Sequence, residues 1–555
     1  MKIKHAIVKI LAVAMSVVTI FAVFAACVGT PGPDDEPIDN TKSQLRVHSF
    51  DGGVGSDWLR ELKPKFEEAF AGESFETGKT GVQILITSDQ TYYNATTIKT
   101  SPINVFFLEA GSSVDLSSSG AALKVTDVVT DTSYGDSIES RMTDRQKGAL
   151  GYNNDYYVIP HYEFYGGLAY DIDVFDEKKL YMSSTAGQWT NLDGSKSLGP
   201  DGKANTSDDG LPATYEEFYA LCDRMVRQGV TPFMSSGNSD YANYLLQALF
   251  VNYAGADGAY YNVSFDSGEK TTEIVTGFNG DVVVTEEKKI TPETGYLLSQ
   301  QAGKYYALSF LEKVLSSDSW KNETSFASTT THSEAQEEFI LGYLENNPYG
   351  FLLDGAYWYN EAVKSGAVGR ASAVYDDVES RRFGWMSLPR FVSGTVTEGN
   401  QVLADLAYSY CVINGNLAEN ETVAHIAKEF VKFAYKEDNL QAFTAKTGVM
   451  RGLEYKLTDE QVASMSVFNQ TMYNLRKDAD VVQPVSASEI FVNNQAAFSW
   501  NIGKDFWAST INNSEVKYPF TVLKQGSSHK SAKEYFEGMK ITQEKWNSSY
   551  GKYFD

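Results

Sequence analysis

The N-terminal part of the mature chain alternates strand-like and helix-like segments, and this order constrains the fold more than any other feature. Residues 45–50 alternate in polarity like a strand, and the glycines of 51–55 turn the chain sharply. Residues 82–86 and 103–108 supply two further strands. Such a strand–helix–strand order predicts a mostly parallel α/β sheet with right-handed crossovers. The helix between the first two strands is indicated by four apolar side chains spaced four residues apart: Trp58, Leu62, Phe66 and Phe70.

Pro64 lies within this helical stripe and predicts either a kink or a second helix start. Further along, periodic apolar residues predict helices at 215–226, 241–251 and 423–434, the last with Asn420 as its cap. A β-hairpin is predicted where two valine-rich runs, 274–276 and 282–284, flank Asn279-Gly280. No fixed-period repeat is present in the sequence.

The loops that follow the first three strands are candidate binding loops, because ligands of open α/β sheets gather outside the carboxyl ends of the strands. These loops follow Phe50, Ile86 and Leu108. Asp51 and Glu109 stand directly at two of the strand ends and could accept hydrogen bonds from ligand hydroxyls.

The N-terminus has the pattern of an export signal. A basic start is followed by an apolar run from Ile10 to Ala26, shorter than the about 20 residues of a membrane span. The run closes on Phe24-Ala25-Ala26-Cys27, which resembles the lipobox of bacterial lipoproteins, although Phe24 replaces the usual leucine. The resemblance implies a signal peptide at 1–26 and lipidation of Cys27. Residues 28–43, rich in Pro, Gly and acids at their start, then form a flexible tether. Ordinary secretion with an incidental cysteine stays the alternative.

Composition excludes several classes of protein. With 555 residues the chain is long enough for about two to four domains. The net charge of −25 argues against nucleic acid, whose phosphates bind clustered Lys and Arg. Three cysteines are too few for a disulfide scaffold, and Cys222 and Cys411 are predicted to be small buried hydrophobic residues. The 34 tyrosines and 8 tryptophans are an unusually rich aromatic supply.

Six segments, in order along the chain, resemble an extracellular solute-binding protein of a bacterial ABC importer, of the carbohydrate-binding type. They include the opening strand, turn and helix, a "P-x-T-x-x-E" helix start at Pro212, and a Gly-x-x-Trp segment ending at Trp358. The segments are 45–70, 157–171, 211–218, 351–360, 383–389 and 427–433.

The resemblance implies a two-lobed periplasmic-binding-protein-like fold of type II, with the cleft between lobes that are joined by several crossing segments. Lobe one would comprise 44–160 plus 393–457, and lobe two 161–392 plus 458–555. The region 257–292 is an insertion without counterpart in the resemblance. The implied function is capture of a carbohydrate and delivery to permease subunits, by a lipid-anchored monomer on the outer face of the cell membrane. The same fold binding a non-sugar solute is the first alternative.

The resemblance and the position of the loops after the first three strands together indicate a set of candidate ligand residues. Trp358 is expected to be exposed and to offer a stacking face for a sugar ring, and His161 is singled out because it lies at the predicted crossing between the lobes. The full set is Asp51, Tyr92, Glu109, His161, Tyr162, Asp354, Tyr357 and Trp358.

The sequence contains no recognisable catalytic motif, so no enzymatic activity and no cofactor are predicted. The histidines lack zinc-ligand spacing, no nucleophile elbow occurs, and the glycines of 72–80 lack the spacing of a phosphate-binding loop. A secreted glycoside hydrolase stays the second alternative, because paired carboxylates need only be close in space. The loop 201–210 offers oxygen ligands of the kind that calcium prefers, although it departs from an EF-hand. Its candidate ligands are Asp201, Asn205, Asp208 and Asp209.

Overall fold

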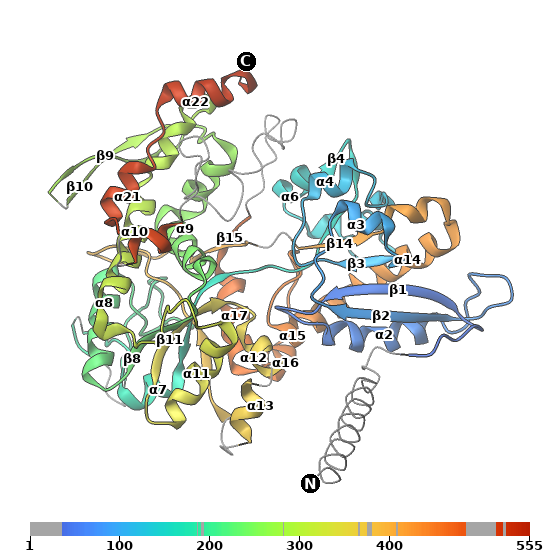
Figure 1. The fold of residues 1–555 in the computed structure, drawn as a ribbon, viewed down its shortest axis with the longest axis horizontal. Helices are drawn as coiled ribbons and strands as arrows, with labels where there is room; N and C mark the ends of the chain where they lie inside the picture. The colour runs from blue at the N-terminus through green and yellow to red at the C-terminus, as the bar shows by residue number, and fades with distance from the viewer. Residues whose placement is uncertain are drawn as a thin grey trace, which may run out of the picture.

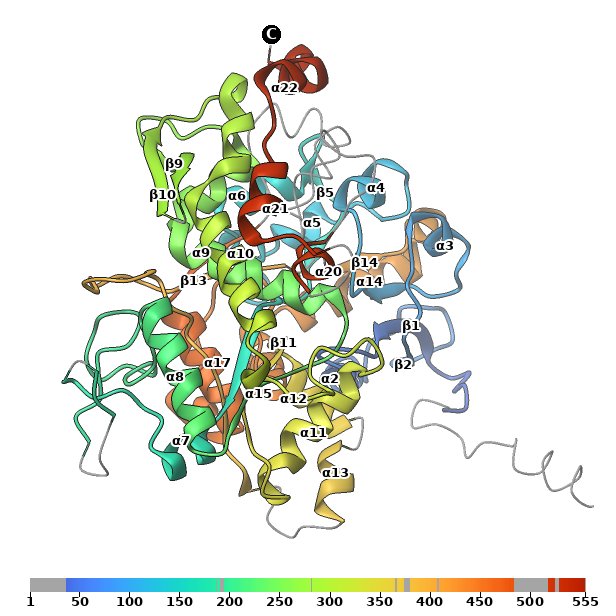
Figure 2. The ribbon, with the colours of Figure 1, turned by 60° about the vertical axis from the view of Figure 1, so that its left-hand side comes forward.

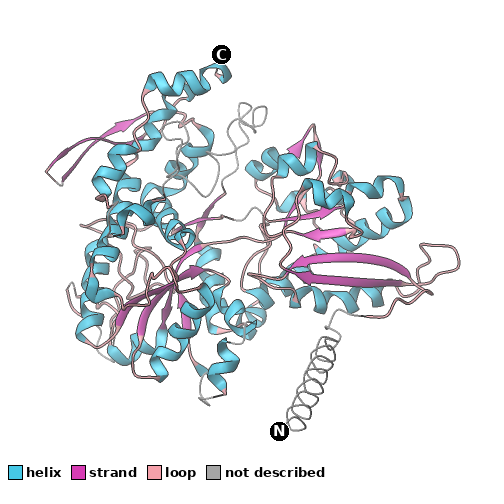
Figure 3. Ribbon diagram, in the orientation of Figure 1, coloured by secondary structure: helices cyan, strands magenta, loops and turns pink. Residues whose placement is uncertain are grey.

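The structure is a computed structural model that describes residues 36–554, except 186, 190–193, 281, 365–366, 374–379, 407–408, 484–517 and 525–528. Two α/β lobes lie side by side, each built on its own sheet (Figure 1). Figure 3 shows helices packed around both sheets. The signal-peptide and Cys27 predictions lie outside the described residues. Among those that are described, no helix combines the length and hydropathy of a membrane span.

The sheet of lobe one has the strand order β2-β1-β3-β14-β6. Strand β1 is parallel to both β2 and β3, which confirms the predicted parallel start of the sheet. Strand β14 returns from far along the chain and is antiparallel to β3 and β6. The strands are β1 (Ser43–Phe50), β2 (Val82–Asp89), β3 (Val105–Phe107), β6 (Ile159–Pro160) and β14 (Tyr410–Ile413).

Helix α2 (Asp57–Ala69) covers this sheet with the predicted apolar stripe, because Trp58, Leu62 and Phe66 are all buried. The helix continues through Pro64 and does not restart there. The ring of Phe66 packs edge-on against Phe430 of α14 at 5.3 Å. The other helices and the hairpin of this part of the chain are α3 (Ala95–Thr100), α4 (Ser113–Ser118), α5 (Thr126–Val129), α6 (Asp144–Leu150), α14 (Glu421–Ala434), α15 (Glu437–Thr447), β4 (Gly151–Tyr152) and β5 (Asp155–Tyr156).

The sheet of lobe two has the order β12-β7-β11-β8. Strand β11 is parallel to β8 and antiparallel to β7, and β12 is antiparallel to β7. The strands are β7 (Gly166–Asp171), β8 (Thr231–Ser235), β11 (Tyr349–Gly355) and β12 (Phe383–Trp385). Short 3-10 helices occur at Glu139–Arg141, Pro292–Gln300, Asp318–Trp320, Gly415–Glu419 and Gly551–Tyr553.

Local signals set several helix starts. Thr214 caps α8 through a capping box with Glu217, and Asn420 caps α14 as predicted. The two cysteines, Cys222 and Cys411, are free and buried, also as predicted. The remaining helices are α7 (Ile172–Lys178), α8 (Tyr215–Arg227), α9 (Ser239–Ser264), α10 (Ala302–Ser316), α11 (His332–Leu344), α12 (Trp358–Lys364), α13 (Ala367–Ser372), α16 (Asp459–Ser464), α17 (Val467–Asp478), α20 (Pro519–Leu523), α21 (Ala532–Gly538) and α22 (Gln543–Tyr550).

The insertion forms the predicted hairpin, with β9 (Thr272–Asn279) antiparallel to β10 (Val282–Lys288). A second apolar cluster packs this region against the C-terminal helix α22. In Figure 2 the hairpin and α22 lie at the same end of lobe two. That cluster is made of Tyr261, Phe265, Ile290, Leu298, Ile541, Trp546 and Tyr550.

Several chain crossings connect the lobes and are tied to one another. The backbone N–H of Phe164 donates to Asp405 Oδ1 at 3.0 Å, and the N–H of Glu163 donates to the carbonyl of Met450 at 2.9 Å. The side chain of Glu163 accepts two hydrogen bonds, at 2.8 and 2.9 Å, from Arg476 of α17. Strand β13 (Val402–Ala404) pairs with β15 (Asp480–Val482) and contacts α9. The segment that was predicted to return to lobe one from residue 393 therefore joins the lobe-one sheet only at β14.

Candidate functional site

Three predicted loops of lobe one meet at one edge of its sheet. Because β1 runs parallel to β2 and β3, the carboxyl ends of the three strands lie together. Asp51, Tyr92 and Glu109 follow these ends. Tyr92 is 65 % exposed and packs against Phe50, with ring centroids 4.7 Å apart. An exposed aromatic face held by a buried ring is well suited to stacking on a ligand.

Tyr162, in the crossing that leaves lobe one, joins this group of side chains. Its hydroxyl donates to Glu109 Oε2 at 2.5 Å, and its ring is buried. The hydrogen bond fixes Glu109, which is half-buried, in one orientation at the end of β3.

Lobe two contributes a stack of aromatic rings. Phe164 lies parallel to Tyr357 with a centroid distance of 4.9 Å, and meets Tyr244 of α9 edge-on at 4.9 Å. A Cβ atom at Gly355 would come within 2.5 Å of the Phe164 ring, and one at Gly166 within 2.0 Å of Tyr244 Cβ. The strand ends therefore need glycine at both positions for the rings to approach the backbone.

The tyrosines from both lobes share one electrostatic environment. Burial raises the pKa of Tyr92, Tyr162 and Tyr357, and the charges of Glu109 and Glu361 raise it further in each case. The pKa of Tyr244 is also raised, first by burial, then by the charge of Asp240 and then by that of Glu109. Tyr162 donates to Glu109, and Gly53 of lobe one lies against both Glu361 and Tyr357 of lobe two, so we treat these groups as one site. The interlobe cluster is defined as Tyr92, Glu109, Tyr162, Tyr244, Tyr357 and Glu361.

The lobes also touch directly beside this cluster. The N–H of Gly53, in the first lobe-one loop, donates to Glu361 Oε1 of α12 at 3.1 Å. Gly53 has a φ of +52°, and a Cβ atom there would lie 3.3 Å from the Tyr357 ring. Asp51 forms an ion pair with Lys364 of α12. Burial opposes ionisation of Asp51, but the ion pair with Lys364 and hydrogen bonds from Ser56 and Ser88 together outweigh it, and the pKa of Asp51 is lowered.

Asp354 lies beneath the cluster at the end of β11 and is only 1 % exposed. It accepts hydrogen bonds from Gln336 Nε2 at 3.1 Å and from the N–H of Gly355 at 2.7 Å. Gln336 Nε2 also donates to Glu361 Oε2 at 3.1 Å, which links the two carboxylates. Burial first, and the charge of Glu361 second, raise the pKa of Asp354 well above its usual range. In this position Asp354 holds Gln336 and Glu361 rather than facing solvent.

The expectation that Trp358 is an exposed stacking face is wrong. Its side chain is 0 % exposed and packs against Phe339, Phe383 and Phe468 at 5.3–5.6 Å. The reason is the helical register, because α12 begins at Trp358 and turns this position inward. Tyr357, one residue earlier, faces Phe164 and Gly53 instead.

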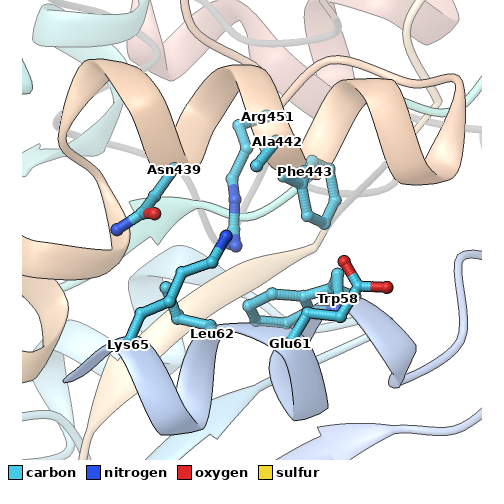
Figure 4. Close-up of a pocket in the computed structure, with 8 residues that line it drawn as sticks. All are labelled: Trp58, Glu61, Leu62, Lys65, Asn439, Ala442, Phe443 and Arg451. Atoms are coloured by element: carbon cyan, nitrogen blue, oxygen red, sulfur yellow. The ribbon is translucent and has the colours of Figure 1, made fainter. Parts of the chain in front are cut away.

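His161 also proves to be a core residue rather than a ligand contact. It is 2 % exposed, and its Nδ1 accepts a hydrogen bond from the Arg451 guanidinium at 3.0 Å. Burial, followed by the Arg451 charge, lowers the pKa of His161 well below its usual range. Figure 4 shows Arg451 between α2 and α15, above Trp58. The pocket there has a volume of about 10 Å³, room for no more than one water molecule.

The candidate calcium loop uses its carboxylates internally. Asp208 accepts from the N–H of Asp201 at 3.0 Å and from the Thr206 hydroxyl at 2.7 Å, and Asp209 accepts from the N–H of Asn205 at 2.9 Å. Burial raises the pKa of Asp208 to about 6. Within the described part of the chain, no group of three or more His, Cys, Asp or Glu residues is placed to hold a metal. Calcium binding stays a prediction.

Sequence reasoning missed Tyr244, Glu361 and Phe164. A signal for Glu361 was present, because Tyr357, Glu361 and Lys364 recur at the spacing of one helix face. No comparable signal marks Tyr244, whose place depends on how α9 docks on β7 and β11.

Comparisons with known proteins agree with the observed architecture. No family model matches the sequence, and no curated protein matches it. The structure is similar to a chitin oligosaccharide binding protein, with a TM-score of 0.51 and 12 % identity over 92 % of this chain and 100 % of the other. It is also similar to a protein described in work on xylan utilization by the thermophilic bacterium Caldanaerobius polysaccharolyticus, with a TM-score of 0.52 and 13 % identity over 90 % and 99 % of the two chains.

A third similar structure is the maltose-bound MalE3 of T. maritima, with a TM-score of 0.50 and 12 % identity over 91 % of this chain and 99 % of the other. At these identities the likeness establishes the fold. The chain has the two-lobed α/β fold of solute-binding proteins, with its interlobe cluster at the junction of the lobes.

Proposed function

We propose that this protein is an extracellular solute-binding protein that captures an oligosaccharide between its lobes and delivers it to the permease of an ABC importer. The observation that carries the proposal is the interlobe cluster, in which tyrosine side chains and the carboxylates Glu109 and Glu361 from both lobes gather where the lobes meet. Sugar rings pack their C–H faces on aromatic side chains, and their hydroxyls donate to carboxylates. Ligand sites commonly combine aromatic walls with a few placed polar groups.

The contacts between the lobes suit a two-state switch. Gly53 and Asp51 of lobe one meet Glu361 and Lys364 of α12, so ligand contacts and lobe contacts share the same two elements. A ligand that touches both lobes would favour this closed arrangement over an open one. No bond is made or broken in this function.

The charges of the cluster argue for a neutral sugar or one bearing an amine. Glu109, Glu361 and Asp51 face the junction, and Lys364 is already paired with Asp51. A uronic acid would bring its carboxylate beside these groups at a cost from like-charge repulsion. The similar structures include a chitin oligosaccharide binding protein, a protein from work on xylan utilization and a maltose-bound protein, which also points to oligosaccharides.

A thermal-shift screen of the soluble mature chain against neutral, amino and acidic oligosaccharides tests this proposal. A ligand at 100 times its Kd should stabilise the native state by about 2.7 kcal/mol. Tyr92→Ala should weaken binding of the best glycan by about tenfold or more, because it removes an aromatic contact.

Tyr134→Ala is the matched control, since Tyr134 is also exposed but lies in lobe one away from the cluster. Its glycan affinity should be unchanged. If no glycan shifts the transition, the carbohydrate proposal fails. Release of shorter products over hours would favour the glycoside hydrolase instead.

The anchoring of the protein is a separate part of the proposal. We infer from the lipobox-like segment that Cys27 is acylated and holds the protein on the outer face of the cell membrane. Cys27→Ala should move the protein from the membrane fraction to the medium or leave it unprocessed. Unchanged processing and fractionation would mean that Cys27 is incidental.

A further inference from the structure

The inserted segment 257–292 builds a groove that is separate from the interlobe cluster. Tyr244 of the cluster lies in the first turns of α9, whereas the groove is lined by residues of the second half of this helix and of the β9–β10 hairpin. Its volume is about 280 Å³. That is near the lower end of the about 300–1,000 Å³ typical of small-molecule sites.

The floor of the groove is a satisfied hydrogen-bond network. Gln301 Nε2 donates to the carbonyl of Gly258 at 2.8 Å and to the Thr272 hydroxyl at 3.1 Å. Its Oε1 accepts from Asn262 at 2.7 Å, and Asn262 Oδ1 accepts from Lys304 Nζ at 2.8 Å. Such a network holds the floor rigid, so a ligand would meet a preformed surface.

One wall of the groove is aromatic. Tyr253 and Tyr261 come from α9, which is broken between them by Gly255 with a φ of 71°. A Cβ atom at Gly303 would lie 3.0 Å from the Tyr253 ring, so glycine there lets the ring lie close to α10.

The hairpin side of the groove carries a pair of like charges. Glu273 of β9 and Glu287 of β10 are directly opposite each other in the antiparallel register, and both line the groove. Like charges at directly opposed positions destabilise a hairpin. Glu273 is half-buried and accepts from the hydroxyls of Tyr253 at 2.7 Å and Thr285 at 2.8 Å, whereas Glu287 is exposed and has no side-chain partner among the described residues.

The other charges near the groove do not neutralise this pair. Lys270 at the rim is paired with Asp257. Lys304 lies beneath the floor, and burial lowers its pKa to about 7, so it carries only part of a charge near neutrality. The groove therefore has an excess of negative charge facing an aromatic wall.

We propose that this groove is a second binding site, for a small hydroxylated primary amine such as an amino-sugar unit. The ammonium group lies between Glu273 and Glu287 and relieves their repulsion, and the apolar face of the ligand packs on Tyr253.

Calorimetry on the mature full-length chain with glucosamine and N-acetylglucosamine tests the proposal, because acetylation removes the charge and keeps the ring. Glucosamine should bind at least about tenfold more tightly than its acetylated form. Glu287→Gln should weaken glucosamine binding by about tenfold. Glu286→Gln is the matched control, since Glu286 directly precedes Glu287 in β10, points to the other face and is paired with Lys288.

A further variant separates the groove from the interlobe cluster. Tyr92→Ala should leave glucosamine binding unchanged, because Tyr92 belongs to the other site. Equal binding of the two sugars, equal effects of Glu287→Gln and Glu286→Gln, loss of binding in Tyr92→Ala, or no saturable binding at millimolar glucosamine would each overturn the proposal.

Discussion

The two faces of the interlobe cluster differ in how they are supported. On lobe one, Tyr92 stands largely exposed on a loop, and Asp51 and Glu109 are half-buried at strand ends. On lobe two, Tyr357 is a chain neighbour of fully buried side chains that include Asp354 and Trp358. On lobe one a side chain can therefore be removed with little effect on folding. On lobe two, Tyr357 of the proposed site directly precedes Trp358, the buried residue at which α12 begins.

The most severe test of this comparison is Trp358→Ala. Deleting a buried Trp should destabilise lobe two by about 3–5 kcal/mol, because it leaves a cavity among Phe339, Phe383 and Phe468. Denaturant unfolding measures the loss, and Tyr92→Ala should cost less than about 0.5 kcal/mol in the same assay.

Trp358→Phe keeps most of the ring volume and should recover most of the lost stability. If Trp358→Ala unfolds at the wild-type denaturant concentration, Trp358 is not part of the core, and the contrast between the two faces disappears.

A second test concerns the crossings that hold the two faces in register. Arg476→Met removes the partner of Glu163 and leaves a buried carboxylate unpaired, which should cost about 3 kcal/mol. Arg476→Met combined with Glu163→Gln should recover part of this loss, since the only carboxylate that then lacks Arg476 is the exposed Glu454. Unfolding monitored for the single and double variants gives the comparison. Equal stability of Arg476→Met and wild type would show that the pair does not hold the crossings.

The parts of the fold that the sequence predicted are those that depend on local patterns. The stripe of α2, the Asn420 cap and the β9–β10 hairpin depend on residues a few positions apart, so periodicity and turn chemistry were enough. The parallel pairing of β1 with β2 and β3 followed from the order of the elements.

The site was less accessible to such reasoning because it depends on long-range packing. The spacing that pointed to Trp358 could not show that α12 starts there and turns the ring inward. Likewise, His161 follows a crossing strand as expected, but its burial depends on Arg451, 290 residues away in sequence. The loops after β1, β2 and β3 were correctly placed because a parallel sheet brings their ends together whatever the rest of the chain does.

The smallest expected effect concerns the ion pair that joins the two faces. Lys364→Met removes the partner of Asp51. A partly exposed pair contributes at most about 1 kcal/mol, so unfolding should change little, but the separation of the lobes measured by X-ray scattering should increase. Arg370→Met, which removes a similarly exposed pair with Glu337 inside lobe two, should leave that separation unchanged.

The pH dependence gives this last prediction its sign. The pKa of Asp51 is lower in the folded protein than in the unfolded chain, so the contribution of the pair is complete above the unfolded value of about 3.9 and is lost as the pH falls through the folded value. Wild type and Lys364→Met should therefore differ in lobe separation at pH 7 and converge when Asp51 is protonated. A difference that persists in strong acid would mean that Lys364 acts through its packing beside Gly55, where an added Cβ atom would lie 3.8 Å from Lys364 Cδ, and not through its charge.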